Sequence, residues 1–272
     1  MPELPEVETV VRGLRAPLVG RIVRGLWTDW ARAIRTPSAE QFAAQIEGQM
    51  FRAVERRAKY IVCQLDRDLL VVHLKMTGRL YVTAAEAQHE ADRWVHVRFD
   101  LDDGQQLRFS DARKFGFVSL VSSLEMLAPN LGPEPLGPEF TREYLSARSR
   151  RHQKAIKALL LDQDFVAGVG NIYADEALHT AGIHPLRPAH SLTDAEISRL
   201  HAAIRCVLVK GIEREGASVN WYRKPDGTSG TAQNHFAVYD RAGQPCLRCG
   251  RLIEKIRVAQ RGTHFCAFCQ PL

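Results

Sequence analysis

The chain has 272 residues, of which 45% are apolar and 25% are charged, and this composition is typical of a soluble protein with one large or two ordinary domains. A net charge of +6 and a pI near 9.1 favour an anionic partner. No apolar run reaches the ~18 residues that a membrane span requires, and the start of the chain lacks signal-peptide order, so we expect a cytoplasmic protein with no membrane partner. In that compartment the six cysteines indicate metal binding or burial rather than disulfides.

The first residues are Met1-Pro2-Glu3, and removal of Met1 would leave Pro2 as a secondary amine beside a carboxylate. The reference pKa of an α-amino group is near 8, against ~10.4 for lysine, so part of it is neutral and nucleophilic at pH 7. Attack on an aldehyde-like carbon would give an iminium. The alternative is a frayed terminus without chemistry. Helical spacing of apolar residues after Pro5 predicts a first helix that carries this terminus.

From about residue 22 to residue 121 the apolar pattern has period two, which predicts an antiparallel β-sandwich. The clearest signal is the run 95–101, followed by the turn 102–104 and a second run. The segment 56–60 enters a strand, and alternation would place Arg57 and Lys59 on one face with Tyr60 on the other.

Two exposed-loop candidates follow strands in this region. Met76 lies in one, and Arg113, Lys114 and Phe115 lie in the other. Apolar side chains beside cations suit insertion between DNA bases, although ordinary packing is the alternative.

The stretch 128–140 is so rich in Pro and Gly that it predicts a linker. Helices are expected beyond it, including 171–181 and a long helix that starts with a capping box from Thr193 to Glu196. Glycines just before Asn171 would leave backbone amides open as an anion site. We therefore expect domains at 1–127, 141–235 and 236–272, separated first by the linker 128–140.

Two Cys-x-x-Cys motifs, separated by sixteen residues, form the strongest motif. Four thiolates in tetrahedral reach of one Zn²⁺ predict a closed, structural and non-catalytic site. The ligands are Cys246, Cys249, Cys266 and Cys269. The other two cysteines, Cys63 and Cys206, are expected to be small buried thiols, and His73 and His96 are expected in core or hydrogen-bonding roles.

Together these segments closely resemble the formamidopyrimidine-DNA glycosylase family of bacterial enzymes, which excise oxidised purines. The resemblance covers nearly the whole chain. It rests on segments 2–9, 56–60, 73–76, 111–116, 131–136, 169–176 and 260–263.

The resemblance implies an α+β multidomain protein: a leading helix with an N-terminal β-sandwich, a helix-two-turn-helix domain and a four-cysteine zinc hairpin. It implies base excision at damaged double-stranded DNA by a monomer near the nucleoid, with lyase cleavage by β- and δ-elimination. In the catalytic roles, Pro2 would be the nucleophile at the sugar C1′, Glu3 a general acid/base, Lys59 a participant in β-elimination, and Arg261 a grip on the backbone.

The resemblance also implies a set of DNA contacts, of which Met76, Arg113 and Phe115 would fill the gap left by a flipped nucleotide. Asn171 would hold phosphate from the helix-two-turn-helix. Beyond the resemblance, we expect DNA contacts from Lys114, Lys154 and Trp94. Glu6 and Glu176 match carboxylates near the family's site.

The sequence departs from the family pattern at three places. Trp94 stands where a DNA-contacting histidine is common. Gln153 stands where a basic residue is frequent, although Lys154 and Lys157 could compensate. The segment 218–235 does not match the family loop that covers the damaged base.

Two alternatives stay open at this point. An endonuclease VIII-like enzyme would prefer oxidised pyrimidines, although Leu4 and the continuation 7–9 lean toward the purine branch. A non-catalytic zinc-ribbon DNA-binding protein would explain the charge and the cysteines but would leave Pro2 and Lys59 without a purpose.

Overall fold

The computed structural model describes residues 1–272, and the chain folds into two compact units. Unit 1 comprises Met1–Pro129 and Glu215–Thr231, and unit 2 comprises Asn130–Arg214 and Ala232–Leu272. The chain first passes from unit 1 to unit 2 in the Pro/Gly-rich stretch 128–140, which contains neither helix nor strand. The domain limits expected from the sequence are continuous and stay a prediction, whereas these units are interleaved along the chain.

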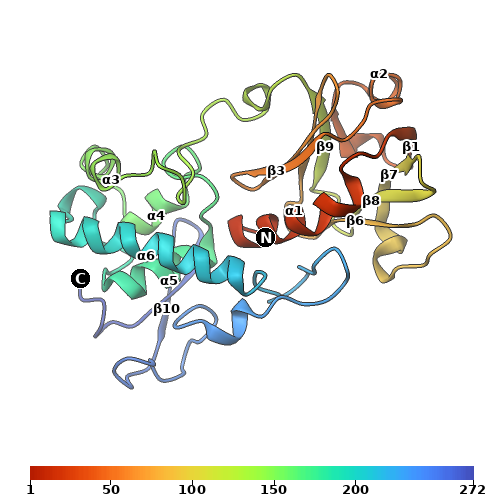
Figure 1. Ribbon diagram of the computed structural model, residues 1–272. Helices are drawn as coiled ribbons and strands as arrows, with labels where there is room; N and C mark the ends of the chain where they lie inside the picture. Colours follow the sequence, from red (N-terminus) through yellow and green to blue (C-terminus); the bar gives the residue numbers. More distant parts are fainter. The chain divides into compact units, whose positions relative to one another are not determined.

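Unit 1 combines two sheets with two α-helices (Figure 1). Its strands pair in the orders β1-β7-β8-β6 and β2-β9-β5-β4-β3. Every pair is antiparallel except β2 with β9, so the expected sandwich is confirmed with one parallel exception. The elements are α1 (Leu4–Leu18), β1 (Val23–Thr28), β2 (Ile34–Thr36), α2 (Ala39–Ile46), β3 (Ala53–Arg57), β4 (Tyr60–Gln64), β5 (Leu69–His73), β6 (Gly78–Ala84), β7 (Val95–Leu101), β8 (Gln105–Asp111) and β9 (Phe117–Val121).

Helix α1 is the predicted first helix, with Pro5 in its first turn, where a missing backbone N–H costs nothing. Its apolar stripe is fully buried and shares one core with residues of both sheets. Val7, Val11 and Leu14 lie in that core beside Ile61 of one sheet and Phe109 of the other. The helix therefore cannot slide without repacking both layers, which gives the start of the chain a rigid base.

Helix α2 corrects the expectation of an all-strand region between residues 22 and 121. Ser38 caps it, because the Ser38 hydroxyl accepts a hydrogen bond from Gln41 N at 3.3 Å. Phe42 and Ile46 bury its apolar side. A Ser followed three residues later by Gln is a helix-start signal that the period-two pattern hides.

Unit 2 is helical, with a terminal two-stranded hairpin (Figure 1). Its predicted capping box is present: Thr193 N donates to Glu196 Oε2 at 2.8 Å, and Glu196 N donates to Thr193 Oγ1 at 3.3 Å. Cys63 is buried as expected, but Cys206 is exposed because it points away from the apolar stripe of its helix. The elements are α3 (Arg142–Ser149), α4 (Ile156–Leu160), α5 (Asn171–Ala181), α6 (Asp194–Glu213), β10 (Glu254–Val258) and β11 (Arg261–Phe265). None of the helices has both the length and the apolar character needed to cross a membrane.

Candidate functional site

Met1 is exposed, but residues 2–6, at the N-terminus of α1, are buried. Pro2 is buried, and Glu3 and Glu6 are 3% and 1% exposed. Glu3 N donates to Glu6 Oε2 at 2.8 Å, and the other oxygen of Glu6 accepts from Ala217 N at 2.7 Å. This arrangement contradicts a frayed terminus, since the segment beside Pro2 is held by named hydrogen bonds.

Lys59 lies in the two-residue turn that joins β3 to β4, where Arg57 pairs directly with Tyr60. The alternation expected from the sequence is therefore wrong, because the turn interrupts the strand and puts Arg57 and Tyr60 on the same side. Ala58 takes a left-handed φ of 54° in that turn. Lys59 itself is 6% exposed and therefore counts as a buried residue.

Arg56 ties this hairpin to α1. Its Nε donates to Glu8 Oε2 at 3.1 Å, and its Nη1 donates to the carbonyl of Ala58 at 3.1 Å. Arg15 adds a second link from the helix to the carbonyl of Val54 at 3.0 Å. The turn that carries Lys59 is thus fixed to the helix that carries Pro2. Arg56 belongs to the site by this role, which the sequence pattern did not reveal.

His73 lies at the end of β5, opposite Tyr60 in the neighbouring strand. Burial, followed by the charges of Lys75 and Lys59, lowers the pKa of His73 to about 3. The neutral ring is fixed by its Nδ1, which accepts a hydrogen bond from Lys75 N at 3.0 Å. The expected hydrogen-bonding role is confirmed, and the cationic surroundings suit an anionic ligand.

Met76, Arg113 and Phe115 are brought together as the sequence predicts. The guanidinium of Arg113 lies 3.4 Å from Met76 Sδ and 4.7 Å from the ring centre of Phe115. Met76 is 43% exposed and Phe115 is 53% exposed. An exposed apolar pair around a cation is the chemistry of a wedge between bases. Lys114 is not part of this cluster, because its Nζ lies over the Trp30 ring, 5.3 Å from the ring centre.

Asp111 and Thr77 organise this cluster, and the sequence analysis assigned neither of them a role. Thr77 Oγ1 donates to Asp111 Oδ1 and accepts from Arg113 N. The other oxygen of Asp111 accepts from Phe115 N at 2.8 Å and from Gly116 N at 2.6 Å. One buried carboxylate therefore sets the shape of the loop. Its position at the end of β8, just before the loop, is the signal that could have found it.

In unit 2, Asn171 begins α5 as predicted, and its side chain donates to the carbonyl of Gly262 at 2.9 Å. Lys157 donates to the same carbonyl at 3.2 Å and to Thr263 Oγ1 at 2.7 Å. Lys157 is 0% exposed, so the expectation that it could replace a basic DNA contact is wrong. Lys154 is partly exposed and pairs with Asp162.

Glu176 lies in α5 and is 7% exposed. Its carboxylate accepts three backbone hydrogen bonds, from Ala237 N at 2.8 Å and from Val238 N and Tyr239 N at 2.9 Å each. Burial nevertheless raises the pKa of Glu176. This carboxylate shapes the segment that leads into the cysteine motifs.

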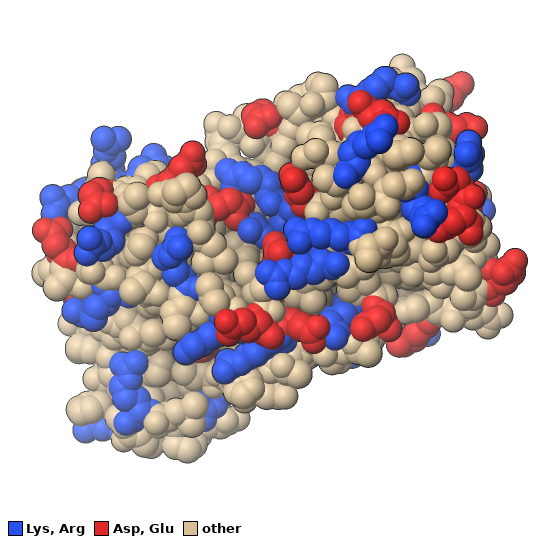
Figure 2. Space-filling model, viewed as in Figure 1, with Lys and Arg blue, Asp and Glu red and all other residues tan.

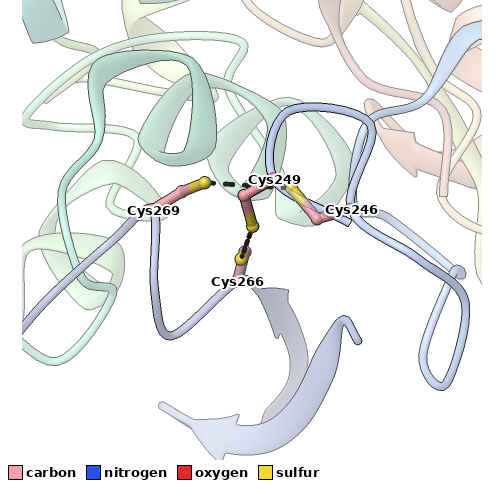
Figure 3. A group of neighbouring side chains, drawn as sticks. All are labelled: Cys246, Cys249, Cys266 and Cys269. Atoms are coloured by element: carbon pink, nitrogen blue, oxygen red, sulfur yellow. Dashed lines mark hydrogen bonds between the residues drawn. The ribbon is translucent and has the colours of Figure 1, made fainter. Parts of the chain in front are cut away.

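The four predicted cysteines converge at the end of the chain (Figure 3). Their sulfur atoms all lie within 4.8 Å of one another, with separations of 3.9 Å for Cys246 to Cys269 and 3.5 Å for Cys249 to Cys266. Tetrahedral Zn²⁺ with Zn–S bonds of about 2.3 Å requires sulfur separations of roughly 3.8 Å. The donor set therefore fits one structural Zn²⁺, as predicted, and its four thiolates close the coordination sphere.

Exposed cations surround this centre. Arg261 begins β11 at the hairpin turn, where its guanidinium makes a 3.4 Å hydrogen bond to the carbonyl of Gln260. Figure 2 shows Lys and Arg side chains exposed over the drawn face, interspersed with acidic ones. The exposed basic side chains of the terminal module are Arg248, Arg251, Lys255, Arg257 and Arg261.

Three family models match the chain. They are the formamidopyrimidine-DNA glycosylase N-terminal domain over residues 1–118, the formamidopyrimidine-DNA glycosylase H2TH domain over residues 131–223, and a zinc finger found in FPG and IleRS over residues 243–272. Trp94 lies in the first match, in a 3₁₀-helix formed by Glu90–Trp94.

Curated relatives are similar over the full length. The chain is 51% identical to the formamidopyrimidine-DNA glycosylase of Symbiobacterium thermophilum, covering 100% of this chain and 90% of the relative. It is 50% identical to the formamidopyrimidine-DNA glycosylase of Chloroflexus aggregans, covering 100% of this chain and 99% of the relative.

Among solved structures, a complex of Lactococcus lactis Fpg (MutM) with Fapy-dG-containing DNA aligns with a TM-score of 0.91 and 36% identity, covering 99% of this chain and 100% of that one. MutM in complex with carbocyclic 8-oxo-G-containing DNA aligns with a TM-score of 0.91 and 37% identity, covering 100% of both chains. The architecture, the four-cysteine centre and the full-length identities agree, and the chain belongs to the formamidopyrimidine-DNA glycosylase family.

Proposed function

We propose that this protein is a bifunctional DNA glycosylase and abasic-site lyase of base excision repair that removes oxidised purines. Support comes from relatives at about 50% identity that carry the name formamidopyrimidine-DNA glycosylase, and from similar structures that hold Fapy-dG or 8-oxo-G DNA. These names favour the purine branch over the endonuclease VIII-like alternative. The match of residues 1–118 to the glycosylase N-terminal model disfavours a purely DNA-binding role.

The observation that carries the proposal is the buried terminus with Pro2 beside Glu3, on a helix tied to the turn of Lys59. After removal of Met1, the Pro2 amine attacks the sugar C1′. The bond from C1′ to the base breaks, and the base leaves with the bonding electron pair and takes up the proton that the amine nitrogen releases. Glu3 supplies or accepts protons at the sugar. The ring opens to an iminium on Pro2, Lys59 assists β-elimination of the 3′ phosphate, and δ-elimination then releases the 5′ phosphate.

Grip on DNA is assigned to residues outside this chemistry. Met76, Arg113 and Phe115 fill the space left when the damaged nucleotide leaves the stack, which offsets a flipping cost of a few kcal/mol. The residues that hold the duplex are Arg261, Asn171, Lys154, Lys114 and Trp94. Glu6 fixes the backbone beside Pro2 in unit 1, and Glu176 fixes the backbone of residues 237–239 in unit 2. We also propose a monomer that acts in the cytoplasm at the nucleoid, because the substrate is there.

Borohydride trapping tests the mechanism. Reduction of the iminium should give a permanent crosslink between the protein and abasic-site DNA, and mass spectrometry should locate it on Pro2. One residue added ahead of Pro2 converts its amine to an amide and should abolish trapping while DNA binding persists. Lys59→Ala should slow turnover by roughly the 10²-fold of a lost acid/base group and still trap. A crosslink mapped to Lys59 would overturn the assignment.

A further inference from the structure

The segment Glu215–Thr231, here called the return loop, leaves the helices of unit 2 and belongs to unit 1. Its two ends meet: a Cβ on Gly230 would lie 2.3 Å from the carbonyl oxygens of both Glu215 and Gly216. Tyr222 in its middle is 7% exposed and joins the core of unit 1. The loop is therefore a compact body with closed ends that docks by one buried ring.

Glu6 links the return loop to the start of the chain. Its Oε1 accepts from Ala217 N at 2.7 Å, while its Oε2 accepts from Glu3 N at 2.8 Å. Gly216 packs closely against Glu6. A Cβ at residue 216 would lie 2.9 Å from Glu6 Cγ, and the φ of +77° also favours glycine there. The docked position of the loop and the backbone beside Pro2 are consequently set by one carboxylate.

The far part of the loop makes an aromatic contact. The rings of Trp221 and Trp94 lie 5.7 Å apart at 78°, an edge-to-face arrangement. The guanidinium of Arg93 covers Trp94 at 3.7 Å. Trp94 and the return loop are both places where this sequence departs from the family pattern, and the structure brings the two departures into contact.

Both rings line a partly open pocket of about 230 Å³. Asn220, Trp221 and Arg223 of the return loop line it together with Thr77 and Trp94. Thr77 Oγ1 also accepts a hydrogen bond from Arg113 N, in the loop after β8 that carries Phe115. Opening of the return loop would remove its residues from this pocket and release the donor that Ala217 gives to Glu6.

We propose that Trp94 is a positioning residue, whose contact with Trp221 holds the return loop docked on unit 1 before DNA binds. An edge-to-face aromatic pair is worth enough to change the local opening equilibrium by roughly 2- to 10-fold. Because DNA meets only the docked fraction productively, loss of the contact through Trp221→Ala, on the loop side, raises KM by up to that factor and leaves kcat unchanged. The KM effect rests on the proposed function, whereas the opening equilibrium does not.

Hydrogen exchange of the free, full-length protein measures opening through the peptide 215–231. Trp94→Ala and Trp221→Ala should each speed exchange of the Ala217 amide roughly 2- to 10-fold. The exchange rate in the double variant should be close to the rate in each single variant, because both substitutions remove the same contact. Trp94→Phe should restore slow exchange. Trp27→Ala is the matched control, since Trp27 is 41% exposed and lies in β1 beside Arg98.

Unchanged exchange in Trp94→Ala and Trp221→Ala, or equal acceleration in Trp27→Ala, overturns the inference. If Trp94→Ala does not fold, the exchange rate of the Ala217 amide is compared between Trp94→Phe and Trp221→Ala instead, and it should be faster in Trp221→Ala. Trapping of the parent protein separates the two claims. A parent that traps on abasic DNA with no exchange effect in the variants leaves the function standing and removes the role of Trp94. Faster exchange in the variants, combined with a parent protein that never forms the trapped crosslink, leaves the role of Trp94 standing and removes the proposed function.

Discussion

Lys157 and Asp175 form an ion pair of 2.6 Å between Nζ and Oδ1, with neither side chain exposed to solvent. The same ammonium donates to Gly262 O and Thr263 Oγ1, and Asp175 Oδ2 accepts from His264 N at 2.9 Å. The pair thus fastens helices α4 and α5 to the strand that begins with Arg261. Removal of one partner leaves a buried charge without its ionic partner.

Lys157→Met should therefore destabilise the protein by about 3–5 kcal/mol. Lys154→Met is the matched control: its pair with Asp162 is partly exposed, and the change should cost less than about 1 kcal/mol. Denaturant unfolding of both variants checks the difference. Equal stability of the two variants would mean that the buried pair is not coupled to the fold.

The zinc centre should be required for the terminal module to fold. Cys249→Ser, or removal of metal by a chelator, should unfold the hairpin and sharply weaken DNA binding, because metal binding supplies the folding free energy of such a small module. Metal analysis should find one zinc per chain in the parent. Cys206→Ser, at an exposed cysteine outside the cluster, should keep both zinc and binding. A zinc-free parent with full activity would refute the site.

Arg261 and Asn171 should differ in the salt dependence of DNA binding. Arg261→Ala should flatten the plot of log affinity against log salt by about one unit of slope, because one cationic phosphate contact is lost. Asn171→Ala should lower affinity with little change in slope, since the amide is neutral and also supports Gly262 O. Fluorescence titration over a range of salt gives both slopes. A parental slope in Arg261→Ala would remove that residue from the backbone contact.

Stability should depend on pH through His73. Its folded pKa of about 3 lies below the ordinary value of 6.5, so the unfolded chain binds a proton that the folded chain excludes between those values. The free energy of unfolding should fall as pH falls from about 6.5 toward 3, by up to about 1.4 kcal/mol per pH unit from this group. His73→Gln should flatten that slope when unfolding is followed between pH 8 and pH 5. An unchanged slope would assign the pH dependence to other groups.

Local and compositional signals predicted much of this molecule. The spacing of Cys246, Cys249, Cys266 and Cys269 sufficed for the metal centre, because ligands close in sequence need little help from tertiary structure. The capping box at Thr193 and the apolar stripe of α1 were likewise predictable, because each depends on residues that are close in sequence.

Signals that depend on distant contacts were missed. Glu6 meets Ala217 across 211 residues, and no local pattern marks Glu215–Thr231 as part of unit 1. Lys157 looked like a member of a basic surface, because burial beside Asp175 is decided by packing of separate elements. Strand alternation failed at Lys59 for a simpler reason, since a two-residue turn resets the period.

The return loop also has a consequence for biosynthesis. A chain made from its N-terminus folds its early segments first, yet unit 1 lacks Tyr222 in its core and the Ala217 partner of Glu6 until residues beyond α6 have left the ribosome. A nascent or truncated chain that stops before Glu215 therefore has the Pro2 terminus without the loop whose Ala217 amide bonds to Glu6. The buried segment that begins at Pro2 reaches its finished surroundings only after the helices of unit 2 have been synthesised.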